Sequence, residues 1–119
     1  MKPVILCYDK CTTCKKALKW VEEMGYDVEI RPIKEENPTE EELKQWHEKS
    51  GLPLKKFFNT SGLLYKEMDL KNKLPEMSEE EQLKLLSTNG MLVKRPMLVD
   101  GDKVLVGFKE SEWENFSTP

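Results

Sequence analysis

The opening segment constrains the fold most, because it places a helix pattern between two strand patterns. Residues 3–8 form a short apolar run typical of a buried strand. Apolar side chains then recur at helical spacing as far as Gly25, which occupies the position of a helix terminator. Residues 26–31 alternate apolar and polar side chains, as a strand does. Two strands joined by such a helix are usually parallel, so the opening predicts a β-α-β unit with a right-handed crossover.

The middle of the chain predicts helices. Thr39 and Glu42 have the spacing of a capping box, and the helix that they start carries Leu43 and Trp46 on its apolar face. Gly51 and Pro53 then mark a break. Residues 54–58 then predict a short helical piece, residues 59–62 a turn, and residues 63–74 a weakly patterned helix.

A second capping box and a strand pair come next. Ser78 and Glu81 begin a helix that ends near residues 89–90. Residues 97–99 and 103–106 then predict two strands, joined by a tight hairpin at Asp100-Gly101-Asp102.

The C-terminal segment completes a recognisable order of elements. Ser111 is expected to cap a last helix, with Trp113 and Phe116 facing the core. The full order is β-α-β, several helices and then β-β-α, which is the thioredoxin layout. We therefore predict an α/β, thioredoxin-like fold with a mixed four-stranded sheet, formed by a single domain over residues 1–119 with a helical insertion at about 38–90.

The composition fits a soluble globular protein. Apolar residues make up 38% of the 119 residues and charged residues 34%. No apolar run approaches the roughly 18 residues of a membrane span, and the N-terminus lacks the apolar region of a secretory signal. We therefore expect a cytoplasmic protein with reduced thiols and no membrane partner. The net charge of −3 argues against direct binding of nucleic acid.

All three cysteines lie between residues 7 and 14, which is not the spacing of a disulfide framework. Redox, metal and cluster chemistry are the classes that such a cluster favours. The only histidine, His47, excludes sites that need two imidazoles, and structural zinc requires four ligands. The spacing Cys-x3-Cys-x2-Cys also occurs in iron–sulfur radical enzymes, but these need a larger barrel domain. We expect no metal.

Cys11 and Cys14 form a CxxC motif where the first strand gives way to the first helix. Free backbone N–H groups and the helix dipole favour a thiolate there, and Lys10, Lys15 and Lys16 add positive charge. Lowering a thiol pKa by two units requires about 2.7 kcal/mol. We predict Cys11 as the nucleophile and Cys14 as the resolving thiol. The alternative is that both are ordinary buried residues, which is the role expected for Cys7 in the strand.

Five short motifs together resemble the arsenate reductase (ArsC-type)/Spx family across nearly the whole chain, closest to an uncharacterised reductase-like branch with a CxxC motif. They are Cys11-Thr12-Thr13-Cys14-Lys15-Lys16-Ala17, Arg31-Pro32-Ile33, Asn59-Thr60-Ser61-Gly62, Lys94-Arg95-Pro96 and Val106-Gly107-Phe108. The resemblance implies a thioredoxin-like core with a helical insert. It also implies that Cys11 attacks an oxyanion or an oxidised thiol, and that Cys14 matches the second cysteine of the Spx-like branch, where the pair forms a redox disulfide.

The resemblance also implies a substrate site. Arsenate reductases of the glutaredoxin-linked type hold the oxyanion with three arginines, of which Arg95 matches one while Asn59 and Lys109 occupy the other two positions. Lysine replaces the planar fork of arginine only in part, so arsenate is not the expected physiological substrate. Pro96 aligns with the proline that is cis in this fold. The remaining substrate-binding candidates are in the motif itself, namely Thr12, Thr13 and Lys15.

Two functions follow from the resemblance. The first is enzymatic reduction of a small oxyanion or a mixed disulfide, without a bound cofactor. An external thiol such as glutathione, or a reducing partner protein such as glutaredoxin or thioredoxin, would then be the electron donor. The second is an Spx-like transcription regulator that binds RNA polymerase, with the α subunit as partner, and uses the cysteine pair as a sensor.

Overall fold

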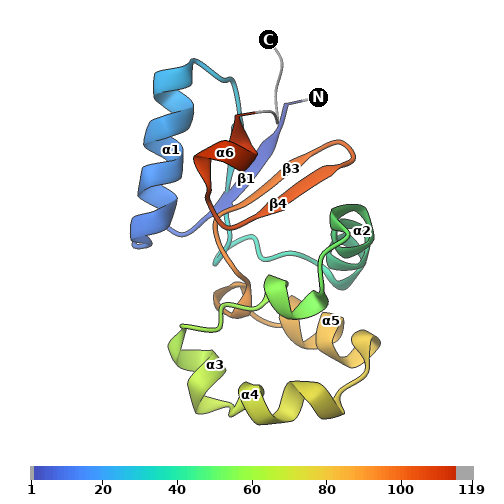
Figure 1. Ribbon diagram of the computed structural model, residues 1–119. Coiled ribbons are helices and arrows are strands. Elements are labelled where there is room, and N and C mark those ends of the chain that lie inside the picture. The colour runs from blue at the N-terminus through green and yellow to red at the C-terminus, as the bar shows by residue number, and fades with distance from the viewer. Residues whose placement is uncertain (1, 115–119) are drawn as a thin grey trace.

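A mixed four-stranded sheet forms the centre of the protein in the computed structural model, which describes residues 2–114 (Figure 1). The strand order is β2-β1-β3-β4, with β1 parallel to β2 and antiparallel to β3. The sheet and the thioredoxin-like layout predicted from the sequence are confirmed. The strands are β1 (Val4–Cys7), β2 (Glu29–Pro32), β3 (Met97–Asp100) and β4 (Lys103–Val106).

Helices occupy the connections, and most of them lie in the long segment between β2 and β3. The α-helices are α1 (Thr12–Met24), α2 (Glu40–Ser50), α3 (Leu63–Glu67), α4 (Leu70–Lys73), α5 (Glu79–Ser87) and α6 (Glu110–Trp113). Short 3-10 turns are η1 (Leu54–Phe57), η2 (Leu74–Glu76) and η3 (Gly90–Leu92). Within residues 2–114, no helix is both long enough and apolar enough to cross a membrane.

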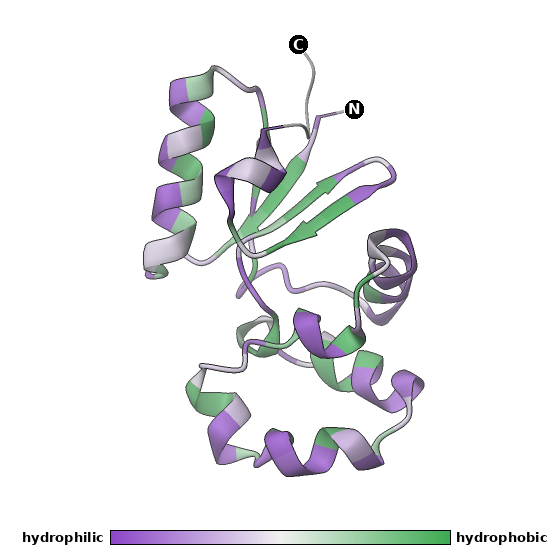
Figure 2. Cartoon of the chain, viewed as in Figure 1, coloured by the Kyte–Doolittle hydropathy of each residue, from purple (hydrophilic) through white to green (hydrophobic). Residues whose placement is uncertain are grey.

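The sheet separates two apolar clusters, as the alternation of side chains along a strand requires. Ile5 and Leu98 face α1 and α6, where they pack with Trp113. Leu6 and Met97 point to the opposite face and pack with the helices of the insertion. Figure 2 shows the strands as the most continuously hydrophobic elements, whereas the helices carry hydrophilic residues along their length. The site elements β1 and α1 are thus held by the first cluster.

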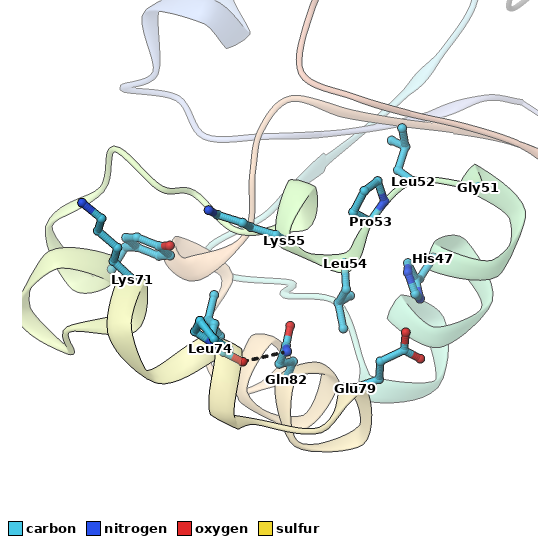
Figure 3. Close-up of a pocket in the computed structure, with 12 residues that line it drawn as sticks. His47, Gly51, Leu52, Pro53, Leu54, Lys55, Lys71, Leu74, Glu79 and Gln82 are labelled. Carbon is cyan, nitrogen blue, oxygen red and sulfur yellow. Dashed lines mark hydrogen bonds between the residues drawn. The ribbon is translucent and has the colours of Figure 1, made fainter.

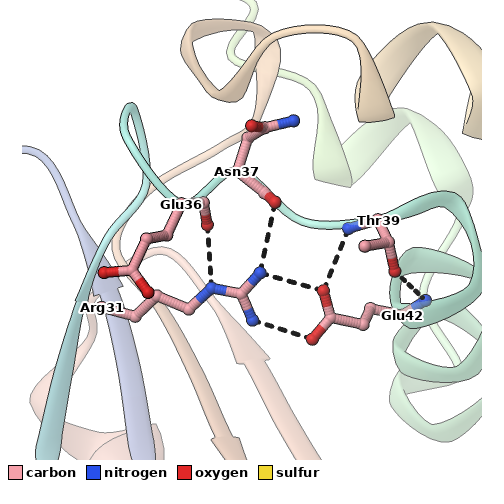
Figure 4. A network of polar contacts seen from close by, with 5 residues as sticks. All are labelled: Arg31, Glu36, Asn37, Thr39 and Glu42. Atoms are coloured by element: carbon pink, nitrogen blue, oxygen red, sulfur yellow. Dashed lines mark hydrogen bonds and ion pairs between the residues drawn. The ribbon is translucent and has the colours of Figure 1, made fainter.

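Both predicted capping boxes are confirmed, at Thr39–Glu42 of α2 and at Ser78–Glu81 of α5. The first box is part of a larger polar network that joins α2 to β2 (Figure 4). Arg31 contacts both carboxylate oxygens of Glu42, at 2.8 and 2.9 Å, and also donates to the backbone carbonyl oxygen of Glu36 at 2.8 Å. One arginine therefore ties the insertion to the end of the parallel strand pair.

The insertion also approaches the sheet closely at Gly90. A Cβ placed on this glycine would lie 1.8 Å from the carbonyl oxygen of Ile33. Only a residue without a side chain allows the two backbone segments to pass here.

Three boundaries differ from the sequence prediction. The predicted helix over residues 63–74 is broken, because Asp69 has a positive φ of 53° and separates α3 from α4. β2 begins at Glu29 rather than at residue 26, because the N–H of Tyr26 bonds the carbonyl of Val21 and completes the end of α1. Ser111 lies inside α6, whose N-cap is Lys109, and Phe116 lies outside the described residues.

Candidate active site at the start of helix α1

Cys11 is the N-cap of α1. Its backbone is extended, with φ −90° and ψ 120°, and its Sγ accepts a hydrogen bond from the backbone N–H of Cys14 at 3.4 Å. The backbone N–H of Cys11 in turn donates to the carbonyl of Tyr8 at 3.0 Å, which closes the loop after β1. The strand end and the helix start therefore place a half-buried sulfur against a free N–H group of the helix, where negative charge is favoured.

Cys14 lies one turn further into α1 and is only 1% exposed. Its Sγ accepts the backbone N–H of Tyr8 at 3.4 Å, and Cys7 lies in the same buried cluster, where we expect its thiol to donate to the Cys14 sulfur. The interaction with Cys7, the Tyr8 N–H, the side chain of Cys11 and the positive charge of Arg95 outweigh burial and lower the pKa of Cys14 to about 6. The same interaction with Cys14, together with burial, raises the pKa of Cys7 far above its ordinary value, so Cys7 stays protonated.

The three cysteines therefore form one cluster of free thiols. The sequence predicted Cys7 as a buried core residue, and it is buried. The sequence did not predict the interaction of Cys7 with Cys14. It also did not predict the role of Tyr8, because this residue acts through its backbone N–H and its side-chain type gives no indication of that contact. The sequence-based interpretation favoured a thiolate at Cys11, whereas the lowered pKa belongs to Cys14, the proposed resolving thiol.

Arg95 and Pro96 lie beside this cluster. The Arg95–Pro96 peptide bond is cis, the isomer expected from the sequence. The guanidinium of Arg95 stacks over the Tyr8 ring, with 5.1 Å from Cζ to the ring centroid. Its Nη1 donates to the carbonyl of Met91 at 3.4 Å, while its buried Nε has no hydrogen-bond partner among the described residues. A buried donor with one unused N–H beside a thiolate is suited to bind an anion.

A cleft of about 840 Å³ opens beside the motif. Thr13 and Lys109, two of the predicted binding residues, line it together with Thr60. Its remaining lining comes from the insertion, the segment before β3 and the segment from β4 to α6, namely Ser50, Leu52, Pro53, Lys55, Lys56, Phe58, Lys94, Val104, Leu105, Val106, Gly107, Phe108 and Glu112.

The other predicted binding residues are placed differently. Thr12 and Lys15 are exposed on the first turn of α1 and are not part of the described lining of the cleft. Asn59 is 9% exposed, and its Oδ1 accepts from Ser61 within the same turn. Among the described residues, no group of three or more His, Cys, Asp or Glu side chains is arranged to hold a metal ion.

A second cavity, of about 590 Å³, lies wholly within the helical insertion (Figure 3). His47, Tyr65 and Gln82 line it, and Gln82 donates to the carbonyl of Leu74 at 3.2 Å. None of the predicted site residues belongs to its described lining, so this cavity is separate from the cysteine cluster.

The fold and the site together place the chain in the class of thioredoxin-like proteins with a thiol pair at the start of the first helix. The model of the ArsC family matches residues 6–116. This chain therefore belongs to the ArsC family.

Two similar proteins cover nearly the whole chain. The uncharacterized protein YusI of Bacillus subtilis is 59% identical, over 90% of this chain and 91% of YusI. The crystal structure of a protein described as ArsC family related, from Bacteroides fragilis, has a TM-score of 0.96 and 56% identity and covers 98% of each chain.

Two further relatives differ in their described function. The regulatory protein MgsR of Bacillus subtilis is 30% identical, over 88% of this chain and 82% of MgsR. The arsenate reductase of Vibrio cholerae has a TM-score of 0.86 over 98% of each chain, and at 23% identity this likeness concerns the fold alone. The similar proteins thus include one described as a regulatory protein, and a fold neighbour described as an arsenate reductase.

Proposed function

We propose that this protein is a thiol–disulfide oxidoreductase, with Cys11 as the nucleophile and Cys14 as the resolving thiol. The observation that supports this most is the position of the Cys11 sulfur, which caps α1 through the N–H of Cys14 and stays half-buried rather than enclosed. A nucleophile needs both charge stabilisation and access, and this position supplies both.

The reaction consists of two exchanges. The Cys11 thiolate attacks one sulfur of an oxidised substrate, a Cys11–substrate disulfide forms, and the other half of the substrate leaves as a thiolate. Cys14 then attacks the Cys11 sulfur and expels the second half of the substrate. The Cys7 and Tyr8 contacts lower the pKa of Cys14 and so favour its thiolate, which is the form that attacks in this second step. Two electrons pass from the cysteine pair to the substrate, and an external thiol returns them.

Arsenate is not proposed as the main substrate. The chain has two arginines, and Arg31 is occupied by Glu42 on the side of the insertion. Arg95 is therefore the only guanidinium left for an oxyanion, beside Lys109 in the adjoining cleft. We expect arsenate turnover to be weak compared with turnover of disulfides, because one planar fork cannot replace three.

The first prediction tests the role of each cysteine. The reduced protein is mixed with a small model disulfide, and the products are followed by mass spectrometry and by thiol release. We expect Cys11→Ser to abolish the reaction and Cys14→Ser to stop at a Cys11–substrate mixed disulfide, because the second thiol is missing. Equal reduction of the disulfide by the wild type and by Cys11→Ser would contradict the proposal.

A redox-sensing regulator is the second candidate, and the likeness to MgsR favours it. In that case the same cysteine pair would report oxidation instead of turning over a substrate. Retention of the RNA polymerase α subunit by the reduced or oxidised protein, without catalytic disulfide turnover, would favour the regulator. A cytoplasmic location is proposed for both functions, since both require thiols that are kept reduced.

A further inference from the structure

The cleft beside the CxxC motif is strongly basic although the whole chain is acidic. Four lysines line it, at positions 55, 56, 94 and 109, and Glu112 is the one acidic residue in the described lining. Three positive charges thus remain in the cleft, on a chain whose net charge is −3. Within residues 2–114, none of these lysines has a carboxylate oxygen within ion-pair distance.

The fold brings these lysines together from distant parts of the sequence. The backbone N–H of Lys94 donates to the carbonyl of Phe57 at 2.8 Å, so the segment with Lys55 and Lys56 lies beside the segment before β3. The N–H of Gly107 donates to the carbonyl of Pro96 at 2.8 Å and brings the end of β4 to the same place. The basic cleft is therefore built by backbone pairing and is not a chance cluster of neighbours.

The cleft also reaches the redox motif. Thr13, which lies between the two cysteines of the motif, contributes to the same lining as Lys94 and Lys109. Its volume of about 840 Å³ lies in the range of small-molecule sites, about 300–1,000 Å³. Cys11 and Cys14 are not themselves part of the described lining, so a substrate would place its disulfide at the end of the cleft marked by Thr13, next to the motif, and its remaining groups among the lysines and the Thr60 hydroxyl.

We propose that the preferred substrates are small disulfides that carry carboxylates, and that Lys55, Lys56 and Lys94 select them. This inference rests on the proposed function and specifies its substrate class. Attack by Cys11 forms the mixed disulfide and releases one carboxylate-bearing thiolate, and attack by Cys14 releases the other. The lysines neutralise the carboxylates, which would otherwise be repelled by the acidic chain as a whole.

The test compares two disulfides of similar size and different charge. These are 3,3′-dithiodipropionate, which has two carboxylates, and bis(2-hydroxyethyl) disulfide, which has none. Single-turnover oxidation of the reduced protein is measured with each, and each rate is divided by the rate of the same disulfide with 2-mercaptoethanol. We expect a normalised preference of about 5–10-fold for the carboxylate compound at low salt, which decreases as ionic strength rises.

Variants then assign the preference to the cleft. Lys56→Gln combined with Lys94→Gln should lower the preference about fivefold, because two attractive charges are removed. Lys84→Gln removes the same type of charge from exposed α5, outside the cleft, and should leave the preference unchanged.

The outcomes separate this inference from the proposed function. If both disulfides react through Cys11 with equal normalised rates, the inference is wrong and the oxidoreductase proposal stands. An equal effect of Lys84→Gln and the double variant would also overturn the inference, since the cleft would then have no special part. If neither disulfide oxidises the cysteine pair, the proposed function fails and the inference fails with it.

Discussion

Cys7 and Cys14 lie in one buried cluster, and we expect the Cys7 thiol to donate to the Cys14 sulfur, a bond that shifts the two pKa values in opposite directions. It keeps Cys7 neutral inside the core and stabilises negative charge on Cys14. A buried residue that would otherwise serve only for packing thus sets the ionisation of the resolving thiol. Each unit of pKa that the bond contributes corresponds to about 1.4 kcal/mol.

A pair of substitutions tests this effect. Cys7→Ala removes the donor and should raise the pKa of Cys14 from about 6 by about one unit or more. Cys7→Ser retains a hydroxyl donor and should keep the pKa low. Thiolate absorbance as a function of pH gives the measurement, with Cys14→Ser to identify the titrating group. If the alanine and serine variants titrate alike, the thiol of Cys7 does not act as this donor.

At the scale of single residues, local spacing placed Cys11 and Cys14 at the start of the first helix, and the resemblance to the family pointed to the cis bond at Pro96; both placements are confirmed. The binding role of Arg95, which also came from the resemblance, stays a prediction. The sequence could not identify the Tyr8 backbone contact or the lysine cleft. Lys55 and Lys94 lie far apart in the chain and meet only through the pairing of residues 57–59 with 92–94. No local pattern carries that information.

At the scale of elements, the carboxylate of Glu42 stabilises the start of α2 through two contacts. Glu42 accepts the Thr39 N–H at 3.0 Å and also pairs with Arg31. The hydrogen bonds of Arg31 and Thr39 lower the pKa of Glu42. A carboxyl group whose pKa is lower in the folded state than in the unfolded state stabilises the folded protein. This contribution is fully present when the pH is above the unfolded-state pKa of about 4.3. That stability is lost as the pH falls through the lower folded value.

Glu42→Gln should therefore destabilise the protein by about 0.5–1 kcal/mol at neutral pH, because the cap bond can persist while the partly exposed ion pair is lost. The difference in stability between the variant and the wild type should shrink as the pH falls below about 4.3 and disappear below the lowered folded pKa of Glu42. Urea unfolding at several pH values measures this. Glu81→Gln in α5 is the matched control, because its capping box has no arginine partner in the described chain, and its effect should be smaller. An equal loss in both would contradict the part assigned to Arg31.

Element prediction succeeded where local chemistry decides, as in the two capping boxes and at Gly25, which ends α1 in the left-handed conformation. It failed where tertiary contacts or single backbone angles decide. The break at Asp69 is one example, because aspartate adopts the left-handed conformation more often than most residues but still only occasionally, so its residue type does not predict the break.

For the molecule as a whole, the joint between the insertion and the sheet depends on Gly90. Gly90→Ala would place a methyl group against the backbone of Ile33, which cannot move aside as a flexible side chain could. We expect a loss of about 3 kcal/mol or more, at the upper end of overpacking effects. Chemical unfolding followed by far-UV circular dichroism gives the value. Ser87→Ala, at the nearby end of α5, is the comparison variant, and a similar small loss in both would show that the loop relaxes freely.

Cys11 caps its helix with sulfur at a position where Ser, Thr, Asp and Asn are the favoured residues. The chain thus forgoes some stability at the start of α1 in exchange for reactivity, the compromise that active sites commonly show. An inactive protein with serine at position 11 should therefore be at least as robust as the natural one. Its failure to react would reflect the missing nucleophile and not a damaged scaffold.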